Sequence, residues 1–432
     1  MVNYVFKVVS IYEAWANGRD LTSDEIYEAS SLLGSPTRKL EVFLSRFRDV
    51  FGQVVEERCC DVGGGRVCIY SWSRRAFKRY FPVALDAGGT VVYYEGGVAK
   101  LVSYPLHRAF DLGVRGVELP SESPSITTPR VDGWQVNLYW DPVLNKWVFS
   151  TRYVLHNMVF VRGELKVEEY GLTINPIVSV AEALASKIGL YSRLDDFKGW
   201  TFTFMIEGSE PATWVKGPPE VSRVDEYKFI LVAARKPSGE LLNPIDSLKV
   251  AEVLGVEGIA MRALELKALE EVRESVDHPS IFLWHLSRGD PEHPEVYEVR
   301  SEVYEDYVNA VRGSNAKSYM LLLTSGSSRV VERLRGAIGD NIVLETLQKL
   351  GELGEVLEEA SRSNPDDLRR LLRAKGLKQD AISTAMKALE EGKPMRVIRI
   401  LLSSLMEGWS IEDTPLIIAN LVEDVRAVAR GL

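Results

Sequence analysis

Residues 130–152, RVDGWQVNLYWDPVLNKWVFSTR, carry the pattern that decides the fold class of this chain of 432 residues. Two runs rich in aromatic and β-branched residues flank the turn DPVLNK, which is typical of two strands joined by a short connection. Further strand patterns follow in TFTFMIEGSEP (201–211), DEYKFILVAARKPSGELL (225–242) and VYEVRSEVYEDYV (296–308). A helical stretch is expected from Ser247 to Val276. The middle of the chain is therefore predicted to combine strands with a helical stretch, which is an α+β composition.

Five segments of this region, in this order, resemble the motifs of the phage-type ATP-dependent RNA ligases, a family of covalent nucleotidyltransferases. The resemblance covers about residues 90–310. YPLHRAFDLG (104–113) is similar to the lead-in before the nucleophile, RVDG (130–133) to the KxDG segment, and TFTFMIEGSEP to the strand with a ribose-binding glutamate. DEYKFILVAARKPSGELL is similar to the strand and turn that follow, and VYEVR (296–300) to the final KxK segment. The resemblance implies a nucleotidyltransferase domain built on an antiparallel sheet and, in an active member, adenylyl transfer from ATP with Mg²⁺ through a lysine.

The chain departs from this family where the chemistry is done. Arg130 stands at the position of the nucleophilic lysine, and a guanidinium cannot be deprotonated at useful pH. Met205 stands at the position of the ribose-binding glutamate, with Glu207 two residues further on. These substitutions predict that adenylyl transfer has been lost.

The remaining ligase-like positions are Asp132, Gly133, Pro279, Ser280, Glu298 and Arg300. Asp132 and Gly133 match the pattern, as expected if they shape the turn. Pro279 and Ser280 replace the Glu-Gly pair that helps to hold metal, and Glu298 replaces the first lysine of KxK, where a carboxylate repels phosphate. The sequence thus predicts no resident metal or cofactor, with ATP and Mg²⁺ used only if ligase activity survives.

Two other functions stay open. The first is an active ATP-dependent RNA ligase whose nucleophile is an unrecognised lysine, for which Lys100, Lys146 and Lys228 are the candidates. The second is a protein-interaction or assembly factor.

The first eighty residues resemble a winged helix-turn-helix in their order of elements. Helical patterns cover 4–16, 22–33 and 35–51, with Ser35 as the expected cap of the third and Pro36 at its first position, and the hairpin runs VVEERCC and RVCIYSW follow. The resemblance implies DNA or RNA binding through the third helix and the wing. The candidate contacts are Arg38, Lys39, Arg46, Arg48 and Arg66, continued in the basic and aromatic linker by Arg74, Arg75, Lys78 and Arg79. Three alternatives stay open. The cations of the third helix can form only its solvated face, the helices and hairpin together can serve as a protein-interaction module, and the basic linker can be an interdomain helix.

The charge of the chain is unevenly distributed along the sequence. The net charge is −9, but residues 35–80 hold ten basic and five acidic side chains, so the N-terminal part is the expected nucleic-acid contact.

No apolar run is long enough to cross a membrane, and the N-terminus lacks a secretory pattern, which favours the cytoplasm. Cys59, Cys60 and Cys68 are too few for a disulfide framework, and Cys59 and Cys60 are interpreted as packing residues on opposite faces of a strand. Four glutamines and three cysteines weakly indicate a thermophile.

The chain is predicted to be helical from Ser314 to its end, in a bundle of about five helices. Six apolar residues are assigned either to its core or to the seam of a homodimer: Ile398, Leu401, Leu402, Ile417, Ile418 and Leu421. Three domains are expected: a winged helix-turn-helix-like domain (1–80), a ligase-like nucleotidyltransferase domain (81–312) and a helical bundle (313–432).

Overall fold

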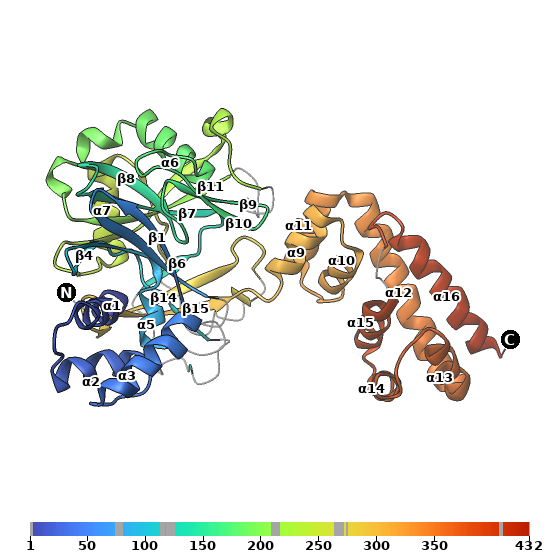
Figure 1. Cartoon of the computed structure of the whole chain (residues 1–432). Coiled ribbons are helices and arrows are strands. Elements are labelled where there is room, and N and C mark those ends of the chain that lie inside the picture. The colour runs from blue at the N-terminus through green and yellow to red at the C-terminus, as the bar shows by residue number, and fades with distance from the viewer. Residues whose placement is uncertain are drawn as a thin grey trace. The chain divides into compact units, whose positions relative to one another are not determined.

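The computed structural model describes residues 3–73, 81–112, 117, 126–208, 217–262, 272–273, 275–405 and 409–431. They form two compact units (Figure 1). The first unit contains Met1–Leu269 and Ser280–Arg300, and the second contains Glu270–Pro279 and Ser301–Leu432. The first is a mixed α+β unit and the second is helical.

The N-terminal helices follow their capping signals. Helix α1 spans Tyr4–Ala16, and α2 spans Ser23–Leu32 with a capping box between Thr22 and Glu25. The third helix differs from its prediction: α3 spans Leu40–Arg46, so neither Ser35 nor Pro36 begins it. It continues as a π-helical segment, η1 (Phe47–Phe51), and a final turn, α4 (Gly52–Val54).

The predicted hairpin forms but is not a free wing. Strands β1 (Val55–Val62) and β2 (Gly65–Trp72) pair in antiparallel register around Gly63 and Gly64, which both have positive φ. Beyond the short helix α5 (Pro82–Leu85), β3 (Gly88–Glu95) pairs with β2, and β4 (Val98–Ser103) pairs with β3. The hairpin therefore belongs to a four-stranded sheet that reaches beyond residue 80.

A disulfide corrects the expectation that the cysteines only pack. Cys59 and Cys68 are direct partners in the β1–β2 register, and their sulfur atoms are bonded to each other. Cys60 is a free thiol on the opposite face of β1, as predicted from its position on the strand. The signal that the sequence interpretation missed is the pairing register, which places two cysteines nine residues apart directly opposite each other.

Two further sheets form the centre of the first unit. The five-stranded sheet has the order β13-β12-β11-β7-β8, and the four-stranded sheet has the order β5-β15-β14-β6. The strands of the first are β7 (Trp134–Asp141), β8 (Lys146–Thr151), β11 (Thr201–Glu207), β12 (Lys228–Arg235) and β13 (Glu257–Gly258). Those of the second are β5 (Phe110–Asp111), β6 (Ile126–Pro129), β14 (Ser280–Gly289) and β15 (Pro294–Arg300). A separate hairpin joins β9 (Met158–Val161) to β10 (Glu164–Val167).

Helices cover one face of the five-stranded sheet. Helix α6 (Pro176–Lys187) packs on β7 and β8, and α7 (Pro244–Leu254) packs on β12. Three short helical turns complete the layer: η3 (Leu190–Arg193), η4 (Asp195–Phe197) and η6 (Val221–Glu226). The helix predicted from Ser247 to Val276 is too long, because Gly255 ends α7 in the left-handed conformation and β13 follows at once.

A buried polar network ties the N-terminus of α1 to the central sheets. The Tyr4 amide donates to Asp86 Oδ2 (2.6 Å), which also lies 2.9 Å from His293 Nε2. The Tyr104 hydroxyl lies 2.8 Å from the same His293 nitrogen, and the Arg235 guanidinium lies 3.6 Å from the centre of the Tyr104 ring. These side chains are buried, and their mutual hydrogen bonds offset the cost of desolvation.

The second unit has eight described helices, and seven of them lie in the stretch after Ser314 for which about five were predicted. They are α9 (Tyr304–Gly313), α10 (Ala316–Leu323), α11 (Ser328–Ile338), α12 (Asp340–Ser363), α13 (Pro365–Ala374), α14 (Gln379–Glu390), α15 (Pro394–Leu405) and α16 (Thr414–Arg430). Helices α12 and α16 pack along each other (Figure 1). The six apolar residues assigned to core or dimer seam lie in or against this core, and dimerisation stays a prediction. Within the described part of the chain, no helix has the length and apolarity to cross a bilayer.

Candidate functional site

Arg130 lies where β6 leaves the four-stranded sheet. Its amide donates to the Ser280 carbonyl oxygen (2.9 Å), which fixes the backbone beside the first residue of β14. Its Nη1 donates to Glu298 Oε1 (2.8 Å) on β15. The positions that resemble the ligase nucleophile and the first lysine of KxK therefore meet as an ion pair, although they are 168 residues apart.

Glu298 is held in its ionised form. Burial by itself raises the pKa of this carboxyl, but Arg130, a hydrogen bond from Ser280 and the charge of Arg300 together lower it below its usual value. The Ser280 hydroxyl donates to Glu298 Oε1 at 2.7 Å. The side chain of Glu298 is 11% exposed, while that of Arg130 is 38% exposed. The pair is thus a mostly buried anion neutralised by a cation that reaches solvent.

Two more arginines surround this pair. Arg300 Nη2 lies 2.7 Å from Asp111 Oδ2 and 4.0 Å from Glu298 Oε2. Arg152 follows β8, and its guanidinium stacks on Trp72 at 5.0 Å. Burial lowers the pKa of Arg152, and so does the positive charge of Arg130, while Glu298 raises it. Three arginines and two carboxylates therefore form one charged cluster.

Position 133, in the turn after Arg130, has no room for a side chain. A Cβ atom at this position would lie 2.0 Å from the carbonyl oxygen of Ile206 on β11, so the backbones touch where β7 begins. Asp132 is buried at the same turn. The close approach of Ile206 accounts for the glycine at position 133, and the role of Asp132 in the turn stays a prediction.

Met205 and Glu207 lie on the same face of β11, opposite the face covered by α6. Met205 packs against a cluster that contains Val131, so it lies close to the turn of Arg130. Glu207 Oε2 lies 3.8 Å from Lys228 Nζ. Burial raises the pKa of Glu207, Lys228 lowers it, and the charge of Asp132 raises it further.

The lysines considered as replacement nucleophiles are not equivalent. Lys100 lies on β4 beside Glu95, and Lys146 is an exposed residue at the start of β8. Only Lys228 among these three lies next to a residue of the ligase-like pattern, and its side chain is 61% exposed.

The expected nucleic-acid contacts fall into three groups. Arg38, Lys39, Arg46 and Arg48 are exposed along α3 and the turns at its two ends. Arg66 lies apart from them on β2, where it donates to Glu13 Oε2 (2.9 Å) and stacks on the ring of Tyr94. Arg38 also has an acidic neighbour, Asp24 Oδ1, at 3.5 Å, but its side chain is 67% exposed. Arg74, Arg75, Lys78 and Arg79 lie outside the described residues.

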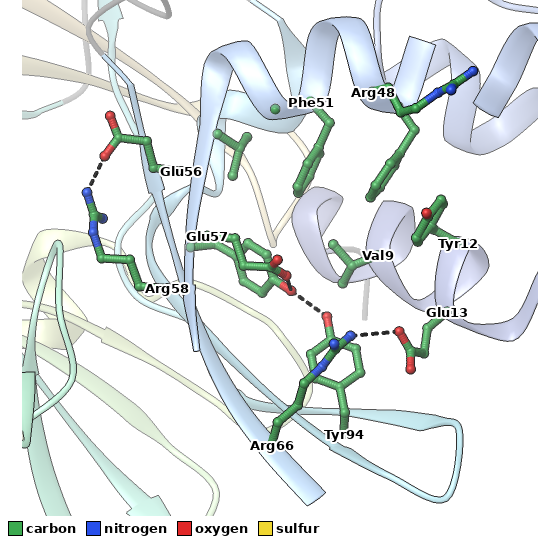
Figure 2. Close-up of a pocket in the computed structure, with 14 residues that line it drawn as sticks. Val9, Tyr12, Glu13, Arg48, Phe51, Glu56, Glu57, Arg58, Arg66 and Tyr94 are labelled. Carbon is green, nitrogen blue, oxygen red and sulfur yellow. Dashed lines mark hydrogen bonds and ion pairs between the residues drawn. The ribbon is translucent and has the colours of Figure 1, made fainter. Parts of the chain in front are cut away.

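An open cavity of about 580 Å³ lies among α1, η1 and the first sheet (Figure 2). Its aromatic lining consists of Tyr12, Phe47, Phe51, Tyr70 and Tyr94, and its charged lining consists of Glu13, Arg48, Glu56, Glu57, Arg58 and Arg66. Arg48 and Arg66 were predicted from the sequence as nucleic-acid contacts, whereas the cavity was not predicted. The cavity depends on the fold, because residues from 9 to 94 come together around it.

One candidate metal cluster occurs in the described part of the chain. Ligand atoms of Glu57, Cys59 and Cys68 lie within 4.8 Å of one another. The two sulfur atoms are joined in the disulfide, so they cannot act as thiolate ligands in this state.

Solved structures of ligases are similar to this chain. An archaeal ATP-dependent RNA ligase in its form 1 aligns with a TM-score of 0.39 and 12% identity over 89% of this chain and 81% of that chain. Form 2 aligns with a TM-score of 0.40 and 12% identity over 69% and 68%. An unliganded mutant of an RNA ligase from Naegleria gruberi aligns with a TM-score of 0.29 and 9% identity over 58% and 97%.

No protein-family model matches the chain, and no curated protein matches it. The structural neighbours are thus ligases at low identity, and the function proposed below rests on the residues of the site.

Proposed function

We propose that the chain is a ligase-like protein that binds nucleic acid and no longer forms an adenylate on a lysine. The observation that carries the proposal is the Arg130–Glu298 ion pair, in which two positions of the ligase pattern meet with the wrong chemistry for adenylyl transfer.

The chemistry of both residues argues against transfer. An attacking amine must be unprotonated, and the guanidinium of Arg130 stays protonated because its pKa is above about 12. Glu298 is ionised, so it repels the phosphates that two lysines would neutralise in an active ligase. A nucleotide phosphate would have to compete with Glu298 for Arg130, and the pair therefore disfavours nucleotide binding at this point.

Nucleic-acid binding rests on the exposed cations of the N-terminal part. Arg38, Lys39 and Arg46 belong to one helix and its N-terminal turn, and their side chains reach solvent. Cations on one helix can contact successive phosphates and release counterions from a strand.

Incubation with α-labelled ATP and Mg²⁺ tests the catalytic half of the proposal. We expect no covalent label on the wild-type chain, because no amine stands at the position of Arg130. A label that survives Arg130→Ala but disappears in Lys228→Arg would overturn the proposal in favour of an active ligase with Lys228 as nucleophile.

Binding of single-stranded RNA at low salt tests the other half. The double variant Arg38→Glu with Lys39→Glu should weaken binding at least tenfold, with a smaller dependence on salt. The matched control reverses Arg369 and Arg370, two arginines of α13 in the other unit. Equal losses in both variants would show that net charge alone is responsible, and no RNA binding at low salt would leave an assembly role.

A further inference from the structure

One face of the β1–β2 hairpin brings together three side chains that can bind a metal ion. Cys59 and Cys68 are direct partners in the strand register, and Glu57 lies two residues before Cys59, so it projects from the same face of β1. Ligand atoms of the three residues lie within 4.8 Å of one another. Both cysteines pack in the core cluster that contains residues of α1, whereas Cys60 packs on the opposite side of the sheet. The three residues thus form one cluster, and Cys60 is not part of it.

Glu57 is the part of this cluster that reaches solvent. Its side chain is exposed and lines the open cavity of about 580 Å³, which it faces from β1 (Figure 2). Its Oε1 accepts a hydrogen bond from the Tyr70 hydroxyl (2.5 Å), which in turn lies 2.5 Å from the Tyr94 hydroxyl. Carboxylates that bind metals are typically oriented by such hydrogen bonds, and a carboxylate can bind an ion with its other oxygen. The cavity therefore gives an ion access to a carboxylate that is already oriented.

The charges around this cluster favour a cation. The thiolates of Cys59 and Cys68 and the carboxylate of Glu57 would together carry three negative charges, one more than a divalent cation neutralises. Arg66 lies two residues before Cys68 on the same face of β2, but Glu13 Oε2 pairs with it at 2.9 Å and offsets its charge. A divalent cation would thus meet a site of net negative charge.

We propose that the reduced chain binds one Zn²⁺ ion on Glu57, Cys59 and Cys68, and that the disulfide closes this site in the oxidised chain. Two thiolates and a carboxylate suit zinc, whereas Cu(I) prefers sulfur ligands and Mg²⁺ and Ca²⁺ take oxygen ligands. The ligand atoms of a tetrahedral zinc ion are roughly 3.5–3.8 Å apart, so small side-chain rotations suffice once the sulfur atoms separate. Binding of the ion does not depend on the function proposed above, because none of its ligands belongs to the ligase-like pattern or to the exposed cations of α3.

The two states interconvert by a balanced exchange of electrons and protons. A dithiol reductant breaks the S–S bond between Cys59 and Cys68: it gives up two electrons and two protons, each sulfur becomes a thiol, and the dithiol closes into its own disulfide. Zn²⁺ then replaces the two thiol protons, which pass to water, and forms two Zn–S bonds and one Zn–O bond. The ion therefore binds where disulfides are kept reduced, and it protects the two sulfur atoms from oxidation there.

Titration of the full chain with Zn²⁺ tests the site, after a chelator has removed metal and with or without reduction by a phosphine. The reduced wild type should bind one Zn²⁺ per chain, at least about tenfold more tightly than the oxidised wild type. With Co²⁺ as the probe, the reduced chain should show thiolate-to-cobalt charge-transfer absorption, which disappears when an oxidant restores the disulfide. This comparison uses one protein in two states, so it does not depend on the folding of a variant.

Variants of the reduced chain then assign the ligands. Cys59→Ser and Glu57→Gln should each weaken zinc binding at least about tenfold. The matched control is Cys60→Ser, which removes the free thiol on the opposite face of β1 and should bind zinc like the wild type. Equal zinc affinity of the reduced and oxidised wild type would overturn the proposal. Loss of binding in Cys60→Ser, or unchanged binding in Glu57→Gln, would overturn the assignment of these three ligands.

Discussion

At the scale of single residues, Arg130 and Glu298, which the sequence interpretation assigned to two lysine positions of the ligase pattern, have opposite charges and form an ion pair. Both residues were named from the sequence, and the loss of adenylyl transfer that they predict stays a prediction. Their contact was not predicted, because it depends on the strand order β15-β14-β6, in which β6 and β15 both run antiparallel to β14 and therefore finish at the same end of the sheet. The hydroxyl of Ser280, which orients Glu298, was noted only as a replacement for a metal-binding pair.

The lowered pKa of Glu298 predicts a dependence of stability on acid. Since the pKa of this carboxyl is lower in the folded chain than in the unfolded one, its contribution is fully present above the unfolded value of about 4.5 and is lost as the pH falls below it. The free energy of unfolding should therefore fall less steeply below pH 4.5 in Glu298→Gln than in the wild type, by at most about 1.4 kcal/mol per pH unit. Denaturant unfolding at several pH values measures the slopes. Glu302→Gln, at an exposed carboxylate, is the control, and identical slopes in wild type and Glu298→Gln would refute the assignment.

The disulfide makes a second prediction at this scale. Cys59→Ser opens a loop whose ends are nine residues apart and should lower the free energy of unfolding by about 2–3 kcal/mol under oxidising conditions. Cys60→Ser is the matched control, because this neighbouring thiol is free and lies on the other face of β1. Once a dithiol reductant is present, the wild type, Cys59→Ser and Cys60→Ser should have similar free energies of unfolding. A Cys59→Ser protein as stable as Cys60→Ser in oxidant would show that the bond does not form.

At the scale of elements, the helices with strong local caps were predicted best. Asn3 caps α1 and Thr22 caps α2, and both signals lie within one turn of the helix. The third helix shows where such signals fail, because Ser30 holds the amide of Thr37 and keeps residues before Leu40 out of the helix. The π-helical segment has no local signal, since it depends on the packing of Phe47 and Phe51 against α1 and β2.

Gly133 provides a prediction for the joint between β7 and β11. Gly133→Ala should lower the free energy of unfolding by about 1–3 kcal/mol, because the added Cβ would meet the Ile206 carbonyl oxygen and force the strands apart. Gly351→Ala is the control: it lies in α12, has open space around its position, and should stabilise by about 0.5–1 kcal/mol. Thermal or denaturant unfolding measures both. No loss of stability in Gly133→Ala would contradict the close approach of the two strands.

At the scale of the whole molecule, composition and periodicity predicted an α+β part followed by helices, and the structure confirms that coarse order. The N-terminal sheet was only half predicted. Its hairpin has local turn signals, whereas its extension by β3 and β4 depends on strands beyond the linker. The cavity beneath α1 depends on that extension, since Tyr94 belongs to β3 and completes its wall.

The central claim is that two residues far apart in the sequence meet as an ion pair in place of a phosphate-binding, nucleophilic site. A double-mutant cycle with Arg130→Met, Glu298→Gln and both together, measured as free energies of unfolding at neutral pH, tests it most directly. Because Glu298 is mostly buried while Arg130 reaches solvent, we predict a coupling energy of about 1 kcal/mol or more. Effects that add to within about 0.3 kcal/mol would contradict the pair.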